Sequence, residues 1–138
     1  MKKTFVMGLA ICITLSTVFP SIAAANELQG TASVFSAFIR EMNIGVYPDS
    51  TRITYELIAR GYADLKSISG TVTLYKKSAS GAYQKIDSKR VSLSGNNISH
   101  TGSFSQGGKG TFKVTFSGTA YAADGSLEAV SSYGIGSY

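Results

Sequence analysis

Cysteine, tryptophan and histidine are scarce in this chain of 138 residues, which contains one Cys, no Trp and one His. The single cysteine, Cys12, lies in an apolar run near the N-terminus, so we expect no disulfide bond and no thiolate chemistry in the folded part. The eight acidic residues are dispersed and lack the spacing of an EF-hand, and a metal site needs several His, Cys or clustered carboxylate ligands. We therefore expect no metal and no cofactor, and a fold that rests on its own apolar core.

Long hydrophobic runs are also missing, apart from one run of about 15 residues at positions 5–19. A helix that spans a bilayer needs roughly 20 apolar residues, so this run is too short. Two lysines precede it, Pro20 ends it, and three alanines follow at positions 23–25, which is typical of a secretory signal peptide. We expect a helical signal peptide over residues 1–25, cleaved after one of these alanines, and a single secreted domain over residues 26–138 without stable membrane insertion.

The expected secreted domain carries little net charge. Removal of Lys2 and Lys3 leaves 11 basic and 8 acidic side chains, a net charge of +3. A nucleic-acid-binding protein presents a dense Lys/Arg face, so we expect no nucleic-acid partner. Mild basicity supports attraction to anionic polymers of the cell envelope. The lack of cysteine after the leader favours export from a Gram-positive bacterium.

Alternation of apolar and polar residues is the dominant pattern of the chain after about residue 40. A period of two with β-branched and aromatic residues predicts strands that bury one face and expose the other. The four clearest buried faces are Met42, Ile44 and Val46; Ile53, Tyr55, Leu57 and Ala59; Ile68, Gly70, Val72 and Leu74; and Phe112, Val114 and Phe116.

Turn-forming residues separate these runs. Clusters of Gly, Asn, Asp, Ser and Pro lie at residues 48–50, 79–81, 94–97, 106–110 and 124–125. The alternation changes phase between Ile86 and Val91, which predicts a bulge or an extra turn near residues 87–90. About seven short strands at this spacing predict an all-β, antiparallel sandwich or barrel.

Two segments near the ends of the domain allow two interpretations each. Residues 32–42 place apolar side chains such as Phe38 and Met42 where they fit one face of a helix, and they also fit one or two bent edge strands. The C-terminal sequence SSYGIGSY, residues 131–138, is either a final edge strand or a frayed end.

Two sequences carry a resemblance to known proteins: GTVTLYKKSASGAYQKI at residues 70–86 and GTFKVTFSGTAYAADGSLEAVSS at residues 110–132. With their neighbours, residues 51–132 resemble an immunoglobulin- or fibronectin-type module, and more closely a group of small secreted Gram-positive proteins of uncharacterised function. The resemblance implies an antiparallel sandwich in a secreted protein, and it implies no activity, because this fold hosts many functions. Many such sandwiches fix a corner with a Tyr hydroxyl, where this chain has Phe112, so packing and backbone hydrogen bonds must hold that corner.

Basic residues concentrate in residues 74–90, with Asp87 as the single acid. Flexible ammonium groups beside tyrosine rings suit phosphate-rich polymers such as teichoic acid, or anionic lipid headgroups. Lysines on a sheet edge also prevent that edge from pairing with other chains, and this alternative stays open. The candidate binding residues are Lys76, Lys77, Lys85, Lys89, Arg90, Tyr75 and Tyr83.

Catalytic residues are expected to be absent. No Gly-x-Ser-x-Gly motif occurs, and the pattern around His100 indicates a partly buried or rim histidine held by a structural hydrogen bond. Strands could bring Glu56 and Glu128 together as a glycosidase pair, but solvated charges or loop anchors are the favoured interpretation.

These patterns predict a secreted, non-enzymatic binding or interaction module. Its partner is expected to be an anionic cell-wall polymer or another extracellular protein. One alternative is an immunity, toxin-like or signalling factor that acts on another protein, and a further alternative is a small hydrolase.

Overall fold

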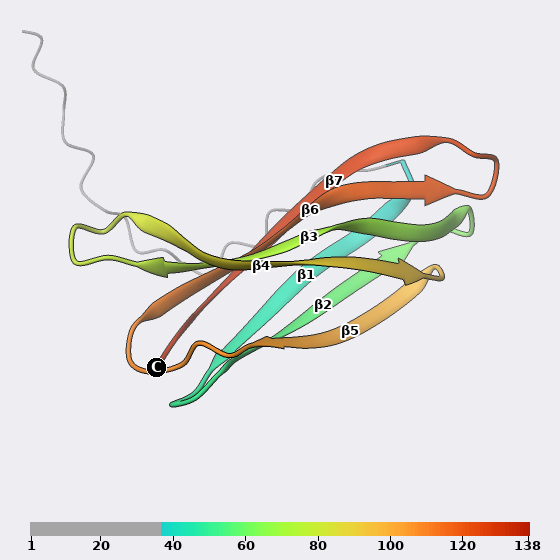
Figure 1. Cartoon of the computed structure of the whole chain (residues 1–138). Coiled ribbons are helices and arrows are strands. Elements are labelled where there is room, and N and C mark those ends of the chain that lie inside the picture. Colours follow the sequence, from blue (N-terminus) through green and yellow to red (C-terminus); the bar gives the residue numbers. More distant parts are fainter. Residues whose placement is uncertain (1–36) are drawn as a thin grey trace, which may run out of the picture.

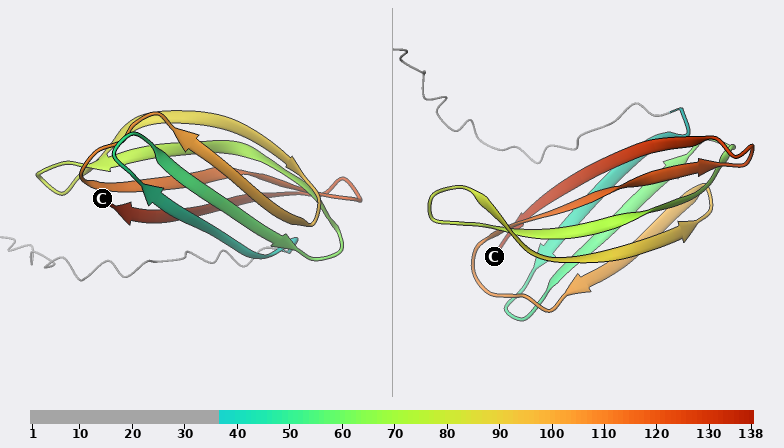
Figure 2. Two further views of the ribbon diagram at one scale, coloured as in Figure 1. Left: turned by 90° about the horizontal axis from the view of Figure 1, so that it is seen from below. Right: turned by 45° about the horizontal axis from the view of Figure 1, so that its top comes forward.

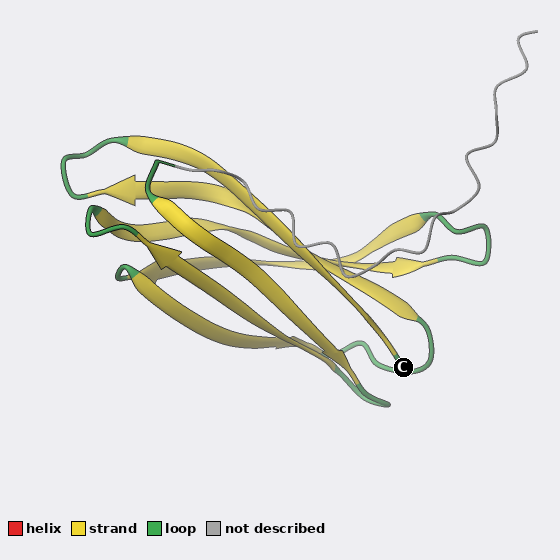
Figure 3. Cartoon of the chain, turned by 180° about the vertical axis from the view of Figure 1, so that it is seen from behind, coloured by secondary structure: helices red, strands yellow, loops and turns green. Residues whose placement is uncertain are grey.

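Seven antiparallel strands in two sheets form the part of the chain that the computed structural model describes, residues 37–138 (Figure 1). No helix occurs in these residues, which confirms the all-β prediction and the strand alternative for residues 39–42 (Figure 3). The predicted signal peptide and residues 26–36 lie outside the described residues. The strands are β1 (Ile39–Pro48), β2 (Ile53–Gly61), β3 (Leu65–Lys77), β4 (Tyr83–Ser94), β5 (Asn97–Phe104), β6 (Thr111–Ala122) and β7 (Leu127–Ser137).

The two sheets lie face to face as two layers (Figure 2). The smaller sheet has the strand order β1-β2-β5, and the larger one has the order β4-β3-β6-β7. Five of the six connections between strands fall in or next to a predicted turn segment, because Gly, Asn and Asp accept the backbone angles that tight connections need. The connection between β2 and β3, residues 62–64, has no counterpart among the predicted turns. Gly81 and Gly125, for example, have φ of 88° and 89°.

The core is built from the side chains that alternate inward from both sheets. All members of the four predicted faces are buried except Gly70, which is half-buried, and Ile98 and Phe104 of β5 join them. Burying one large apolar side chain stabilises a fold by roughly 1.5–3 kcal/mol, so this cluster provides most of the driving force for folding. The prediction of period-two burial is therefore confirmed.

Small side chains allow β7 to lie directly against β1 on one side of the sandwich. The Ser132 hydroxyl donates a hydrogen bond to the carbonyl oxygen of Met42 at 3.2 Å. A Cβ atom on Gly134 would overlap with the carbonyl oxygen of Ile44, so only glycine fits there. The C-terminal sequence is thus a strand of the larger sheet, which settles the choice between an edge strand and a frayed end.

The expected irregularity in β4 is a bulge, and it lies one residue before the predicted segment. Leu74 is in register with Asp87 and Tyr75 with Lys85, so Ile86 is the extra residue. Its side chain is 39% exposed, although an apolar residue in a strand is expected to point toward the core. The bulge resets the alternation, so Lys85 and Lys89 point to opposite faces of the sheet.

Backbone hydrogen bonds hold the corner before β6, as expected for a chain with Phe112 at this position. The N–H of Gly110 donates to the carbonyl oxygen of Tyr138, and the N–H of Tyr138 donates to that of Gly110, each at 3.0 Å. The Phe112 side chain is 1% exposed and packs in the core.

The contact between β1 and β7 yields a first prediction. Gly134→Ala forces its new methyl group against the β1 backbone and is expected to lower the free energy of unfolding by about 1–3 kcal/mol. Urea unfolding followed by circular dichroism measures the change. The control is Ser131→Ala, at an exposed position of the same strand, which is expected to have little effect. Equal stability of both variants would contradict the close approach.

Two turns give a pH prediction. Asp49 accepts hydrogen bonds from the N–H groups of Thr51 at 2.7 Å and Arg52 at 2.8 Å, and these hold its pKa below the usual 3.8. The N–H of Ser126 does the same for the pKa of Asp124, at 2.8 Å.

Because both pKa values are lower in the folded state, the turns contribute their full stability above about pH 4, the pKa of an unfolded chain. That contribution is lost as the pH falls through the folded pKa values. NMR titration of the two carboxyl groups tests this. In the variant Asp49→Asn, the decrease in the free energy of unfolding at low pH is expected to be smaller, because position 49 no longer titrates. Folded pKa values at or above the ordinary value would contradict it.

Candidate functional site

The β3–β4 hairpin carries the basic residues singled out in the sequence. It projects beyond the ends of the neighbouring strands in both views (Figures 1 and 2). The N–H of Ser78 donates to the carbonyl oxygen of Ala82 at 2.8 Å, and the N–H of Gly81 donates to that of Ser78 at 2.9 Å. These bonds close the turn and fix the register between β3 and β4 on either side of it.

Strand pairing brings lysines and tyrosines together on the outward side of the larger sheet. Lys77 is in register with Tyr83, and Tyr75 is in register with both Lys85 and Lys113. Directly paired residues of antiparallel strands point to the same side, and the buried neighbours Leu74 and Val114 point to the other side. We call this surface the lysine–tyrosine face; it consists of Tyr75, Lys77, Tyr83, Lys85, Lys113 and Tyr133.

Lys113 lies at the centre of this face between two aromatic rings. Its Nζ is 5.2 Å from the ring centroid of Tyr83 and 4.9 Å from that of Tyr133. The Nζ of Lys77 is 5.7 Å from the Tyr83 ring. Each such cation–π contact at an exposed site is worth about 0.5–1 kcal/mol, so the rings order the ammonium groups without neutralising them.

The outward positions of the larger sheet contain no acidic residue. Asp87 and Glu128 are the acids of its four strands, and both occupy inward-facing positions, in register with Leu74 and Ala120. Arg90 adds a further cation on the outward side, in register with Thr71. Within residues 37–138, the outward positions of these four strands therefore carry cations and no carboxylate.

Two of the predicted binding residues lie elsewhere. Lys76 has the inward parity and places its Nζ 5.3 Å from the ring of Phe112. Lys89 also points inward; its Nζ donates a hydrogen bond to the carbonyl oxygen of Ser103 and lies 5.2 Å from the Phe104 ring. Lys89 thus bridges β4 and β5 across the open side of the sandwich. The other five predicted residues share the outward side.

Sequence reasoning missed Lys113 and Tyr133 as members of the site. The alternation of Phe112, Lys113 and Val114 already marks Lys113 as outward. The missing information is the pairing of β6 with β3, which places Lys113 beside Tyr75 although 38 positions separate them in the sequence.

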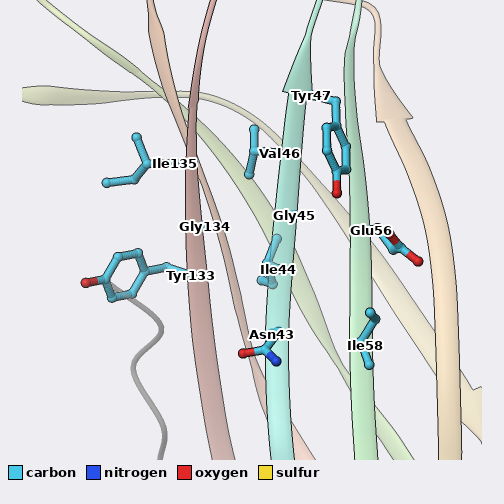
Figure 4. Close-up of a pocket in the computed structure, with 10 residues that line it drawn as sticks. All are labelled: Asn43, Ile44, Gly45, Val46, Tyr47, Glu56, Ile58, Tyr133, Gly134 and Ile135. Carbon is cyan, nitrogen blue, oxygen red and sulfur yellow. The ribbon is translucent and has the colours of Figure 1, made fainter. Parts of the chain in front are cut away.

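A groove of about 320 Å³ adjoins this face where β7 meets the outer side of β1 and β2 (Figure 4). Tyr133 lines the groove and also contacts Lys113, so it belongs to both surfaces. The ring of Tyr47 covers Gly45, where a Cβ atom would lie 2.6 Å from the tyrosine hydroxyl. The lining residues are Asn43, Ile44, Gly45, Val46, Tyr47, Glu56, Ile58, Tyr133, Gly134 and Ile135.

The two candidate carboxylates lie far apart. Glu56 is in register with Gly45 of β1, whereas the Glu128 carboxylate accepts a hydrogen bond from the N–H of Ala37 at 2.9 Å. Six residues along β1, from Ile39 next to this segment to Gly45, correspond to roughly 20 Å at about 3.3 Å per residue. A glycosidase pair is at most about 10 Å apart, so this geometry does not form one. Glu128 is an anchor for the chain at the start of β1, as expected.

His100 is half-buried on the inward side of β5, in register with Leu57. Its contact is with an aromatic ring, since its centroid lies 6.0 Å from that of Tyr55. Burial raises the pKa of the Tyr55 hydroxyl, which accordingly stays protonated at neutral pH.

Residues 37–138 contain no group of three His, Cys, Asp or Glu side chains placed to hold a metal ion. They also contain no helix long and apolar enough to cross a bilayer. No family model matches this chain, and no curated protein is significantly similar to it in sequence.

The anchor at Glu128 gives a third prediction. Glu128→Ala removes the acceptor of the Ala37 and Phe38 N–H groups, so their hydrogen exchange is expected to accelerate about tenfold. Exchange followed by NMR measures the effect. The control Leu127→Ala changes an exposed neighbour and is expected to leave these two amides unaffected. Unchanged exchange in the Glu128 variant would show that the carboxylate does not hold this segment.

Proposed function

We propose that this protein is a secreted, non-catalytic binding module with an immunoglobulin- or fibronectin-like fold. Its lysine–tyrosine face binds an anionic polymer of the cell envelope. The observation that carries this proposal is the outward surface of the larger sheet, on which cations cluster around tyrosine rings and no acid occurs. Secretion rests on the signal-like pattern of residues 1–25.

The strand order supports the fold assignment. In an immunoglobulin constant-type sandwich the first, second and fifth strands share one sheet with the fourth, and the third, sixth and seventh form the other. This chain keeps both groups of three and has its fourth strand beside the third. The difference concerns one edge strand, and the grouping of the other six strands supports the assignment.

Phosphate-rich polymers match the chemistry of this face. Lysine ammonium groups bind phosphate as point charges, and the tyrosine rings offer flat surfaces to the polyol or sugar between phosphates. Each exposed ionic contact is weak and screened by salt, so affinity arises from repeated contacts along the polymer. The adjoining groove extends the same surface through Tyr133.

Protection of a sheet edge accounts for only part of this arrangement. Lys85 and Arg90 lie on β4, which is an edge strand, where charge prevents pairing with other chains. Lys113 lies on β6, an interior strand with neighbours on both sides, and edge protection does not explain a lysine there. Its position between two tyrosine rings favours a binding role.

Co-sedimentation with Gram-positive cell walls tests the proposal. The purified protein is expected to bind walls that contain teichoic acid, to lose most of that binding between about 50 and 500 mM salt, and to bind stripped walls weakly. The variant Lys77→Gln/Lys113→Gln is expected to bind about tenfold more weakly.

The control Arg52→Gln/Lys66→Gln removes the same charge at exposed positions away from the face and is expected to retain nearly full binding. Binding that is insensitive to salt, or equal losses in both double variants, would rule out this face as the site. Circular dichroism confirms that each variant is folded.

A further inference from the structure

A second polar cavity lies at the end of the molecule opposite the β3–β4 hairpin. It has a volume of about 290 Å³ and is formed by the start of β1, the end of β2 and the β4–β5 turn. Ten residues of β3, from Ser67 to Lys77, separate that turn from the hairpin, which corresponds to roughly 33 Å (Figure 1). The lining residues are Arg40, Arg60, Gly61, Asn96 and Asn97.

A β-bulge places Arg40 at this cavity. Ile39 is in register with Gly61 and Glu41 with Arg60, so Arg40 is the extra residue of the bulge. Ile39 is buried and Arg40 is exposed. The bulge therefore keeps Ile39 in the core and leaves the side chain of Arg40 at the surface. Bulges commonly redirect a side chain next to a functional site. Here the bulge brings a second guanidinium beside Arg60.

Backbone contacts hold the opposite wall in place. The N–H of Gly61 donates a hydrogen bond to the carbonyl oxygen of Asn96 at 2.7 Å. Asn97 is in register with Arg60 on the outward side of the smaller sheet. The backbone of both asparagines is therefore fixed relative to the end of β2, and donor groups line the cavity from three segments of the chain.

The cavity carries a net positive charge. Arg60 pairs with Glu41 through Nη1 and Oε2 at 3.2 Å, and the other oxygen of Glu41 accepts from Asn43 Nδ2 at 2.7 Å. No carboxylate of residues 37–138 lies within ion-pair distance of Arg40. Two arginines thus line the cavity, and one carboxylate, that of Glu41, pairs with Arg60.

We propose that this cavity binds a phosphate group, separately from the polymer site on the larger sheet. Guanidinium groups donate paired hydrogen bonds to phosphate oxygens, and carboxamides add single donors. Donors that converge from three segments surround a tetrahedral anion better than a planar carboxylate. The phosphate belongs either to a small monoester or to a phosphodiester in a polymer.

NMR titration of the purified protein tests this site at constant ionic strength. The probes are inorganic phosphate, glycerol 3-phosphate and poly(glycerol phosphate), with sodium chloride as the reference. Saturable shifts are expected for the amides of Gly61, Asn96 and Asn97. Arg40→Gln is expected to weaken binding about tenfold, and Arg40→Lys less, because lysine keeps the charge and loses the paired donors.

The matched control is Arg52→Gln, an exposed arginine that pairs with Asp49 and is expected to leave the affinity unchanged. Binding of the two small phosphates assigns the site to monoesters, and binding of the polymer alone assigns it to phosphodiesters. Either result supports the proposal only if Arg40→Gln, folded by circular dichroism, is weakened. No saturable shift with any probe, or equal affinity in Arg40→Gln, overturns it. Lys77→Gln/Lys113→Gln is expected to bind here normally, which separates this test from that of the lysine–tyrosine face.

Discussion

The close approach of the last strand to the first determines how the rest of the molecule is arranged. Ser132 and Gly134 of β7 face inward and are small enough for the backbone of β1 to pass over them. Because side chains alternate, Tyr133 and Ile135 then point outward. Tyr133 completes the lysine–tyrosine face and also lines the groove. A bulky inward residue at position 134 would separate the sheets and divide that surface.

Alternation within single strands was readable from the sequence because the burial of every second side chain leaves a direct pattern. The faces that contain Val72, Leu57 and Phe116 needed no knowledge of strand order. Bulges were harder to place, because one extra residue reverses which positions face inward. The bulge at Ile86 is displaced by one residue from the predicted segment, and the one at Arg40 has no distinct sequence signal.

The candidate site was predictable only in part, since residues close in sequence are not always close on one face. Lys76 and Lys77 are adjacent, yet one contacts Phe112 at the end of the core and the other lies on the outward side. Lys113 joins the face through the pairing of β6 with β3. Such long-range pairing depends on which strands become neighbours in the complete fold. The local sequence pattern of a single strand does not contain that information.

The unequal distribution of charge between the two layers has a consequence for how the molecule meets a surface. The outer side of the smaller sheet carries Glu41 and Glu56 together with Arg60, so its charges largely cancel, whereas the strands of the larger sheet present cations alone on their outer side. The molecule therefore has a dipole across its thickness. Within a Debye length of about 8 Å from a negatively charged layer, this dipole rotates the molecule so that the larger sheet faces that layer before any contact forms. Adsorbed molecules would then share one orientation, with β1, β2 and β5 presented to the medium.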